Sequence, residues 1–260
     1  MISTTRKSFS ARSQSGFTLI ELITVIVILS IIATFGSGFV VSTLDAYSQT
    51  QDRSKLINRG RQAIEQITRR IRGATPNSIR ITGNCLEFLP LASGGNYLNA
   101  VPDLNNGAPA SNTISITPYS VDFGTARHVT IGADSAGDIY SGGSLATLDS
   151  FTATTLTLTG NKVWQRNSPT RRFYLTDNPE SFCMTGANLL HHSGYATPLT
   201  STGTPGGAGT LMAENVSSGT PFAIEAGTET RGAVVMIDLV FAEKDQQVPI
   251  RQEVFVRNVP

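Results

Sequence analysis

The feature that most constrains this chain is an apolar stretch near its N-terminus, Phe17–Val41, which contains a single ionisable side chain, Glu21. About 20 helical residues suffice to cross the hydrocarbon core of a bilayer, so this stretch is long enough to span one. A secretory signal peptide has a shorter apolar region that is followed by a small-residue cleavage site. The sequence therefore predicts one membrane-spanning helix over residues 17–41.

The segment before this helix, residues 1–16, is polar and contains Arg6, Lys7 and Arg12 but no acidic residue. Basic flanks tend to remain on the cytoplasmic side of a membrane. We therefore expect a single-pass, N-in orientation in the inner membrane, with the globular part in the periplasm. The basic residues that begin at Arg53 lie on the other flank and weaken this orientation signal.

Glu21 needs a counter-charge, because a carboxylate near the start of a membrane span is costly unless it is paired, protonated or within reach of the headgroups. No Lys or Arg lies within the span. A cut between Gly16 and Phe17 would create a free α-amino group at the same membrane depth. In two staggered subunits, this amine and the carboxylate of Glu21 could neutralise each other where the dielectric is low. The pairing would set the register of helix-to-helix assembly.

The string Gly16-Phe17-Thr18-Leu19-Ile20-Glu21-Leu22, after a short basic leader and before an apolar helix, resembles the type IV prepilin signal. This resemblance implies that a prepilin peptidase cleaves after Gly16 and methylates the new amine of Phe17. It also implies that Glu21 guides docking with other pilin subunits at an inner-membrane assembly platform, which moves the subunit from the lipid bilayer to a pilus at the cell surface. An ordinary signal anchor is the alternative, and it explains neither the glycine at the junction nor the position of the carboxylate.

Helical periodicity continues beyond Val41. Apolar residues recur at spacings of three, four and seven: Leu56, Ala63, Ile64, Ile67 and Ile71. This pattern predicts an amphipathic stalk helix over residues 42–73, which ends at Gly73 shortly before Pro76. Gly36 and Gly38 weaken the helix between its two halves. They predict either a local bend or melting, or close helix packing in the membrane.

The charge is distributed unevenly along the chain. Residues 42–73 carry seven Lys and Arg against three acids, whereas residues 74–260 carry ten against fifteen. An acidic globular part is a poor electrostatic match to nucleic acid, so we expect no nucleic-acid partner. One basic face of the stalk consists of Arg59, Arg69, Arg70 and Arg72. They could contact lipid or nucleic acid, but a solvated face or pairing with an acidic neighbouring subunit is favoured.

Residues 74–260 change to short β-type runs separated by Gly, Asn, Asp and Pro. The predicted strands are Ser78–Thr82, Cys85–Leu91, Thr113–Thr117, Val129–Gly132, Thr154–Thr159, Arg171–Thr176, Phe182–Met184, Phe222–Glu225, Ala233–Ala242 and Ile250–Arg257. The last two are predicted to form a hairpin across Glu243–Pro249, and the apolar run Val234–Phe241 to be covered on both faces. Asn105–Asn112 and Thr197–Thr210 are predicted surface loops. The expected fold class is α+β, and the prepilin resemblance implies a pilin fold, in which a long helix packs against an antiparallel sheet.

The two cysteines, Cys85 and Cys183, lie in or beside predicted strands. In an exported protein such a pair is expected to form one structural disulfide, whereas in the cytosol it would remain as two thiols. The exported compartment therefore favours the disulfide.

Candidate catalytic and metal-binding residues are sparse. His191 and His192 are adjacent, and adjacent residues of a strand point to opposite faces, so the pair is unsuited to one metal. The Asp134–Asp138 segment superficially resembles a calcium loop but lacks the further ligands of the known loop, so a turn is favoured. No serine lies in a Gly-x-Ser-x-Gly elbow. We therefore expect no enzyme activity, no metal and no cofactor.

Several segments outside the N-terminal signal resemble one group of minor pilins. They are Gln62–Gly73 with Pro76-Asn77-Ser78, Cys85–Pro90, Arg172–Leu175, Ser181–Cys183 and Val256–Pro260. Together they resemble the O-type minor pilin of the mannose-sensitive haemagglutinin (MSHA) pilus system, and more distantly W-type minor pilins and the J-type pseudopilin of type II secretion. The resemblance implies a low-copy subunit near the filament tip that helps to initiate assembly. A tip adhesin that binds a ligand through its two predicted loops is a further alternative.

Overall fold

The computed structural model describes residues 16–118, 124–195, 209–225 and 232–256. Most of the predicted leader, most of the predicted loop Thr197–Thr210, and the chain end from Arg257 to Pro260 lie outside the described residues. The chain divides into two compact units, Met1–Gln51 and Asp52–Pro260, and the boundary falls inside the first helix.

The first helix, α1, runs without interruption from Leu19 to Arg72. It begins two residues after the predicted start and ends where predicted, next to Gly73. The helix continues through Gly36 and Gly38, so the predicted local melting is wrong. A Cβ atom added at either glycine would meet no atom within 4 Å.

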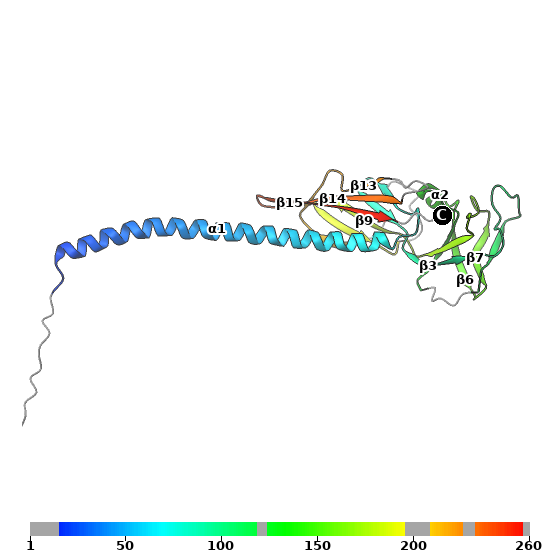
Figure 1. Ribbon diagram of the computed structural model, residues 1–260, viewed down its shortest axis with the longest axis horizontal. Helices are drawn as coiled ribbons and strands as arrows, with labels where there is room; N and C mark the ends of the chain where they lie inside the picture. Colours follow the sequence, from blue (N-terminus) through cyan, green and yellow to red (C-terminus); the bar gives the residue numbers. More distant parts are fainter. Residues whose placement is uncertain (1–15, 119–123, 196–208, 226–231, 257–260) are drawn as a thin grey trace, which may run out of the picture. The chain divides into compact units, whose positions relative to one another are not determined.

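The rest of the chain forms antiparallel sheets, so the expected α+β architecture with a long N-terminal helix is confirmed and is consistent with a pilin fold (Figure 1). One sheet has the order β1-β2-β9-β10-β11 and contains β1 (Arg80–Thr82), β2 (Cys85–Phe88), β9 (Glu180–Thr185), β10 (Asn188–His192) and β11 (Thr210–Ala213). In a second sheet, β14 (Ala233–Glu243) pairs with β12 (Val216–Ser217), β13 (Phe222–Glu225) and β15 (Gln246–Val256). The third has the order β3-β8-β5-β6-β7-β4 and contains β3 (Leu91–Asn96), β8 (Arg172–Thr176), β5 (His128–Ile131), β6 (Leu145–Phe151), β7 (Thr155–Lys162) and β4 (Ser111–Ser115). A short helix, α2 (Ala136–Tyr140), precedes β6.

The globular unit has two main hydrophobic cores. The larger core joins the C-terminal part of α1 to the first two sheets, with Leu56, Ile67 and Ile71 of the helix fully buried. All five residues of the predicted apolar stripe are buried there. The other core is built by the third sheet around Trp164, Phe173 and Leu175. The stalk helix is therefore an integral part of one core and not of the other.

Two strand predictions are corrected. β14 is buried continuously along one face only, by Val235, Ile237, Leu239 and Phe241. On the other face Val234 is buried, but Met236 is 38% exposed. The predicted strand Cys85–Leu91 is divided, because β2 ends at Phe88 and Leu91 begins β3 in a different sheet. Pro90 lies between them and has no amide hydrogen to donate to a continuing ladder.

Candidate functional site: the N-terminal helix and its attachment to the sheets

Helix α1 begins with a capping interaction between Thr18 and Glu21. The backbone amide of Glu21 donates to Oγ1 of Thr18 at 3.3 Å, and the amide of Leu22 donates to the Thr18 carbonyl at 3.2 Å. Ser or Thr followed three residues later by Glu is the sequence of a capping box. An acidic side chain in the first turn is also favoured by the partial positive charge of a helix N-terminus. Thr18 therefore fixes the helix start, and Glu21 lies within the first turn.

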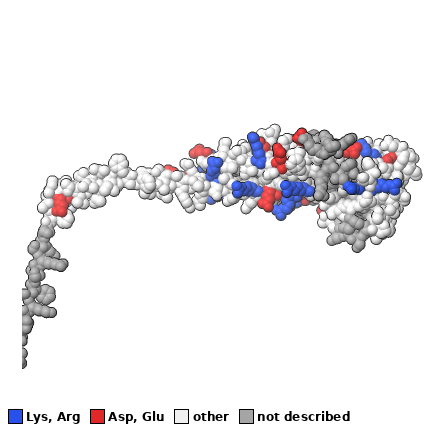
Figure 2. Space-filling view, in the orientation of Figure 1, with Lys and Arg blue, Asp and Glu red and all other residues white. Residues whose placement is uncertain are grey.

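Gly16 and Phe17 lie just before the helix and are exposed. The first part of α1 is long and apolar enough to cross a membrane. Its large side chains are exposed throughout, and Phe17, Phe35 and Phe39 are each more than 70% exposed. The visible face of this stretch is almost free of charge, whereas charged groups cluster from the stalk onward (Figure 2). Such a surface requires lipid or other helices as its neighbours.

The stalk is attached to the second sheet by close packing at Gly60. A Cβ atom at Gly60 would clash with Cδ1 of Ile250 and would come 2.8 Å from Cε2 of Phe241. The glycine therefore lets β14 and β15 approach the helix closely. In this way the sheet holds the helix just beyond its exposed apolar part.

An ion pair lies at the start of the buried stalk. Nζ of Lys244 donates to Oδ2 of Asp52 at 2.6 Å, and Lys55 lies 3.6 Å from Oδ1 of the same carboxylate. The hydrogen bond from Lys244 lowers the pKa of Asp52 more than burial raises it. The same hydrogen bond raises the pKa of Lys244.

A second polar contact ties the end of the stalk to the first sheet. Glu180 of β9 accepts a hydrogen bond from Nη1 of Arg70 at 2.7 Å and lies 2.9 Å from Nε2 of His191. Burial raises the pKa of Glu180, but the hydrogen bond with His191 and the charge of Arg70 together lower it below its ordinary value. Arg70 is thus paired inside the domain, and Arg59 lies 4.0 Å from Glu243. Two of the four arginines of the predicted basic face, Arg59 and Arg70, therefore have partners in their own chain.

A disulfide joins Cys85 of β2 to Cys183 of β9. The two residues are direct cross-strand partners in the first sheet, and the bond links positions 98 residues apart in the sequence. It lies in the sheet against which the stalk packs, so it stabilises the surface that holds the helix.

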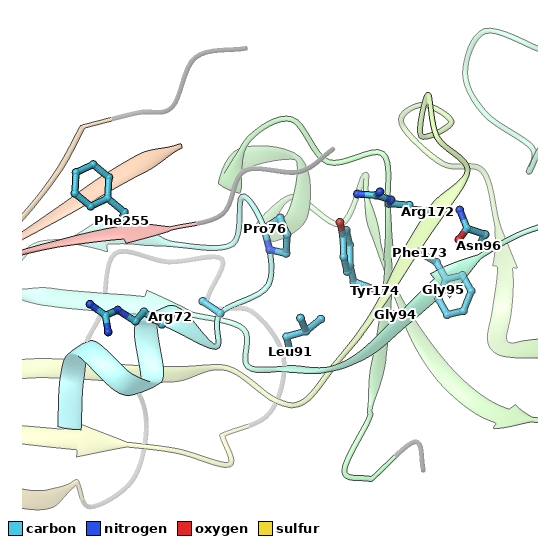
Figure 3. A pocket seen from close by; sticks show the side chains of 11 residues that line it. Arg72, Pro76, Leu91, Gly94, Gly95, Asn96, Arg172, Phe173, Tyr174 and Phe255 are labelled. Carbon is cyan, nitrogen blue, oxygen red and sulfur yellow. The ribbon is translucent and has the colours of Figure 1, made fainter. Parts of the chain in front are cut away.

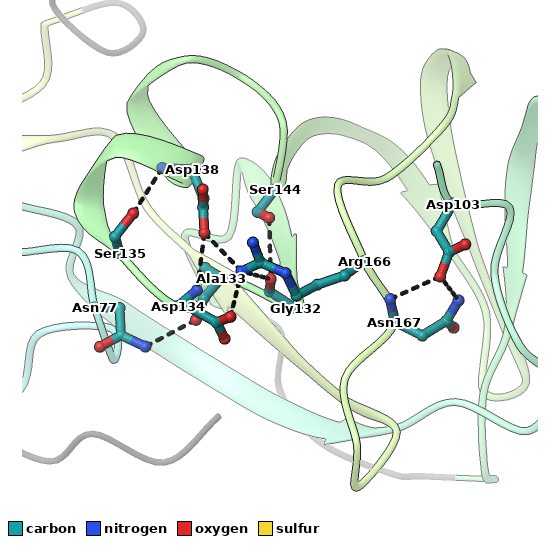
Figure 4. A network of polar contacts seen from close by, with 10 residues as sticks. All are labelled: Asn77, Asp103, Gly132, Ala133, Asp134, Ser135, Asp138, Ser144, Arg166 and Asn167. Carbon is teal, nitrogen blue, oxygen red and sulfur yellow. Dashed lines mark hydrogen bonds and ion pairs between the residues drawn. The ribbon is translucent and has the colours of Figure 1, made fainter. Parts of the chain in front are cut away.

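The remaining candidate residues serve structural contacts. His191 contacts Glu180, whereas His192 is buried, and burial lowers the pKa of its imidazole. Asp134 and Asp138 both pair with Arg166, at 2.5 and 2.8 Å (Figure 4). The Asp134–Asp138 segment leads into the first turn of α2, which is capped by Ser135: the Ser135 side chain accepts a hydrogen bond from the amide of Asp138. In the described residues, no group of three or more His, Cys, Asp or Glu is placed to hold a metal.

Comparison with known proteins identifies a family motif in the N-terminal segment. Residues 11–37 match the family model described as the prokaryotic N-terminal methylation motif. The chain carries a type IV prepilin-like N-terminus. This motif indicates a type IV pilin-like or pseudopilin protein, a kind of structural subunit that is processed by a prepilin peptidase and assembles with other pilins. Neither the curated proteins nor the solved structures gave a match.

The processing and docking residues predicted from the sequence lie together at the start of the pilin-like helix: Gly16 and Phe17 precede it, and Glu21 lies in its first turn. The contacts that hold it to the sheets were not predicted. Lys244 and Glu180 lie 192 and 110 residues from their partners Asp52 and Arg70, and no local pattern signals such pairs.

Proposed function

We propose that this chain is a minor subunit of a type IV filament, which is cut between Gly16 and Phe17 and methylated on Phe17. The proposal depends on one observation: Glu21 lies in the first turn of an exposed apolar helix that continues into the core of the globular unit. Such a helix can leave the bilayer and enter a helical filament core without unfolding the domain attached to it.

Glu21 supplies the reason for the cut. Arg53 is the first cation after Glu21 along α1, far outside the apolar stretch. The partial charge at the helix N-terminus offsets only part of a carboxylate in a low dielectric. Cleavage after Gly16 provides an α-amino group, and in an assembled filament the amine of one subunit pairs with Glu21 of its neighbour. The pair then fixes the axial register of the two helices.

Before assembly, the subunit is a single-pass protein of the inner membrane. Arg6, Lys7 and Arg12 hold the leader in the cytoplasm, and the globular unit lies in the periplasm. An oxidising periplasm agrees with a disulfide between Cys85 and Cys183. An assembly platform then transfers the helix into the filament.

Replacing Glu21 tests the pairing. In cells that assemble filaments, Glu21→Ala is expected to be cleaved normally but to be absent from the sheared filament fraction in an immunoblot. Asp45→Ala is the matched control, because it removes a carboxylate from an exposed position of the same helix. Normal incorporation of Glu21→Ala would refute the pairing.

Replacing Gly16 tests the cut. A bulky residue in Gly16→Phe is expected to leave the leader attached, so that the protein remains at precursor size on a gel. A mature-sized product in this variant would contradict the assigned bond.

Within the filament, we assign the chain to the initiating tip complex of an MSHA-like pilus. The resemblance of Cys85–Pro90, Arg172–Leu175 and Ser181–Cys183 to the O-type minor pilin supports this assignment. Deleting the gene is expected to reduce the number of filaments per cell, with the length of the remaining filaments largely retained. The alternative is a J-type pseudopilin. In that case deletion would abolish protein secretion and leave surface pili unchanged.

A further inference from the structure

The globular unit contains an open cavity of about 660 Å³ between the end of α1, the end of β15 and the β3–β8 ladder (Figure 3). This volume lies within the range of about 300–1,000 Å³ that is common for small-molecule sites. The cavity is lined by residues of α1 and of the second sheet, including Arg72 and Phe255, and by residues of the third sheet, including Tyr174.

One wall of the cavity carries a supported aromatic ring. Tyr174 of β8 pairs with Gly94 of β3, and a Cβ atom at Gly94 would come 3.1 Å from Cδ1 of the tyrosine. The ring therefore packs against bare backbone, which fixes its orientation. Its ring lines the cavity, and Phe255, which is 68% exposed, lies at the other end of the cavity (Figure 3).

Next to this ring lie an amide and a guanidinium. Arg172 and Asn96 are paired across β8 and β3, two residues along from the pair Tyr174 and Gly94. Side chains two residues apart in a strand point to the same face, so Arg172 and Asn96 lie on the same face as Tyr174. Nδ2 of Asn96 donates to the Thr170 carbonyl at 3.0 Å, which leaves the amide oxygen as an acceptor. An aromatic face, a hydrogen-bond acceptor and a cation are thus adjacent.

The cavity is also cationic. Arg72 and Arg172 both line it, and within the described part of the chain neither pairs with a carboxylate. Arg70 and Arg166, by contrast, each form short ion pairs with acids of this chain. Two guanidinium groups without a carboxylate partner at one cavity favour an anionic ligand.

We propose that this cavity binds an acidic saccharide, a pyranose ring that carries a carboxylate. The guanidinium of Arg172 matches a carboxylate in a two-pronged hydrogen-bonded geometry. The C–H groups on one face of the sugar contact the ring of Tyr174, and Asn96 accepts from a hydroxyl. The site lies wholly in the globular unit, so it stands independently of the proposed filament function and is distinct from the predicted loop Asn105–Asn112.

Titration calorimetry on the full chain tests this proposal, in a detergent whose headgroup is not a sugar. The probes are a 1,4-linked galacturonic acid dimer, the 1,4-linked galactose dimer as its uncharged counterpart, and citrate as a carboxylate without a sugar ring. The acid dimer is expected to bind at least about tenfold more tightly than either of the others. Equal affinity for citrate or for the neutral dimer, or no binding of the acid dimer, would overturn the proposal.

Variants locate the site. Arg172→Gln and Tyr174→Leu are each expected to weaken binding of the acid dimer by about tenfold or more. Arg61→Gln, an exposed arginine of the stalk outside this cavity, is the matched control and should leave the affinity unchanged. Melting curves establish that each variant is folded. Arg172 is exposed, so Arg172→Gln is expected to fold, and it tests binding at the cavity even if Tyr174→Leu is unstable. Unchanged affinity in folded Arg172→Gln would contradict the assignment.

Discussion

Lys244, at the turn between β14 and β15, donates a hydrogen bond to Asp52 of α1 at 2.6 Å, across 192 positions of sequence. Asp52 is the first residue of the globular unit and lies one turn before Leu56, the first fully buried apolar residue of the helix. The hairpin tip is thus fastened to the helix at the point where the helix becomes part of the core. Lys244 has a positive φ of 53°, so the turn that presents it adopts a left-handed backbone conformation.

This pair predicts coupled effects of substitution. Asp52→Asn and Lys244→Gln should each lower the melting temperature of the globular unit, and the double variant should lose less than the sum of the two. The coupling should fade as salt is raised, because the pair is in contact with solvent. Asp45→Asn is the control that should leave the melting temperature unchanged. Strict additivity would show that the pair does not hold the hairpin.

Glu180 predicts acid sensitivity. Its pKa is lowered in the folded state by His191 and Arg70, against a reference value of 4.5. As the pH falls below about 4.5, this carboxylate takes up a proton in the unfolded chain before it does so in the folded chain. Its contribution to the free energy of unfolding is therefore fully present above this pH and is lost as the pH falls through the lowered folded-state pKa. Denaturant titrations at a series of pH values should show this loss. Glu180→Gln should reduce the loss of unfolding free energy at low pH. An unchanged loss in this variant would rule out the Glu180 carboxylate as its source.

Replacing Gly60 with alanine is predicted to cost more by steric overlap than it gains in helix propensity. Alanine favours a helix by about 1 kcal/mol over glycine, but a methyl group at Gly60 would clash with Ile250 and Phe241. Overpacking costs about 1–3 kcal/mol, so Gly60→Ala should destabilise the globular unit. Gly36→Ala is the matched control, because no atom lies within 4 Å of an added methyl group there. The two variants should differ clearly in melting temperature, and equal melting would contradict the close packing.

The Cys85–Cys183 disulfide predicts a large loss of stability on reduction. Closing a loop of this length stabilises a fold by about 4–5 kcal/mol in the chain-entropy model, and the bond links positions 98 residues apart. The double variant Cys85→Ser/Cys183→Ser should unfold at a lower denaturant concentration than the oxidised protein. If reduction left the unfolding midpoint of the native protein unchanged, the bond would be shown to contribute nothing.

The parts of the fold with strong local signals could be predicted. The stripe through Leu56, Ile67 and Ile71 repeats at helical spacing, and Gly73 followed by Pro76 stops the helix within one residue of the observed end. Phe222–Glu225 and the β14–β15 hairpin were also predicted, although the turn is shorter than Glu243–Pro249, since Glu243 pairs directly with Gln246.

The missed elements depend on tertiary contacts. β3 contains Gly94 and Gly95, which disfavour a strand, and the rings of Tyr174 and Phe173 on the paired strand pack against them. β6, β10, β11 and β12 were not predicted, and the Asp134–Asp138 turn opens into α2. β14 was predicted to be covered on both faces, because its residues are apolar almost without a break. In the structure, buried and less buried side chains alternate along most of the strand, since one face packs against the helix. The cavity beside Tyr174 could not be predicted, since its walls come from α1, β3, β8 and β15.

Intact-mass and N-terminal analysis of the protein, extracted from cells with an active prepilin peptidase, tests the account most directly. We predict a chain that begins at Phe17 and carries a methyl group on its α-amine. A chain that retains residues 1–16 would leave Glu21 without its counter-charge and would contradict the proposed function.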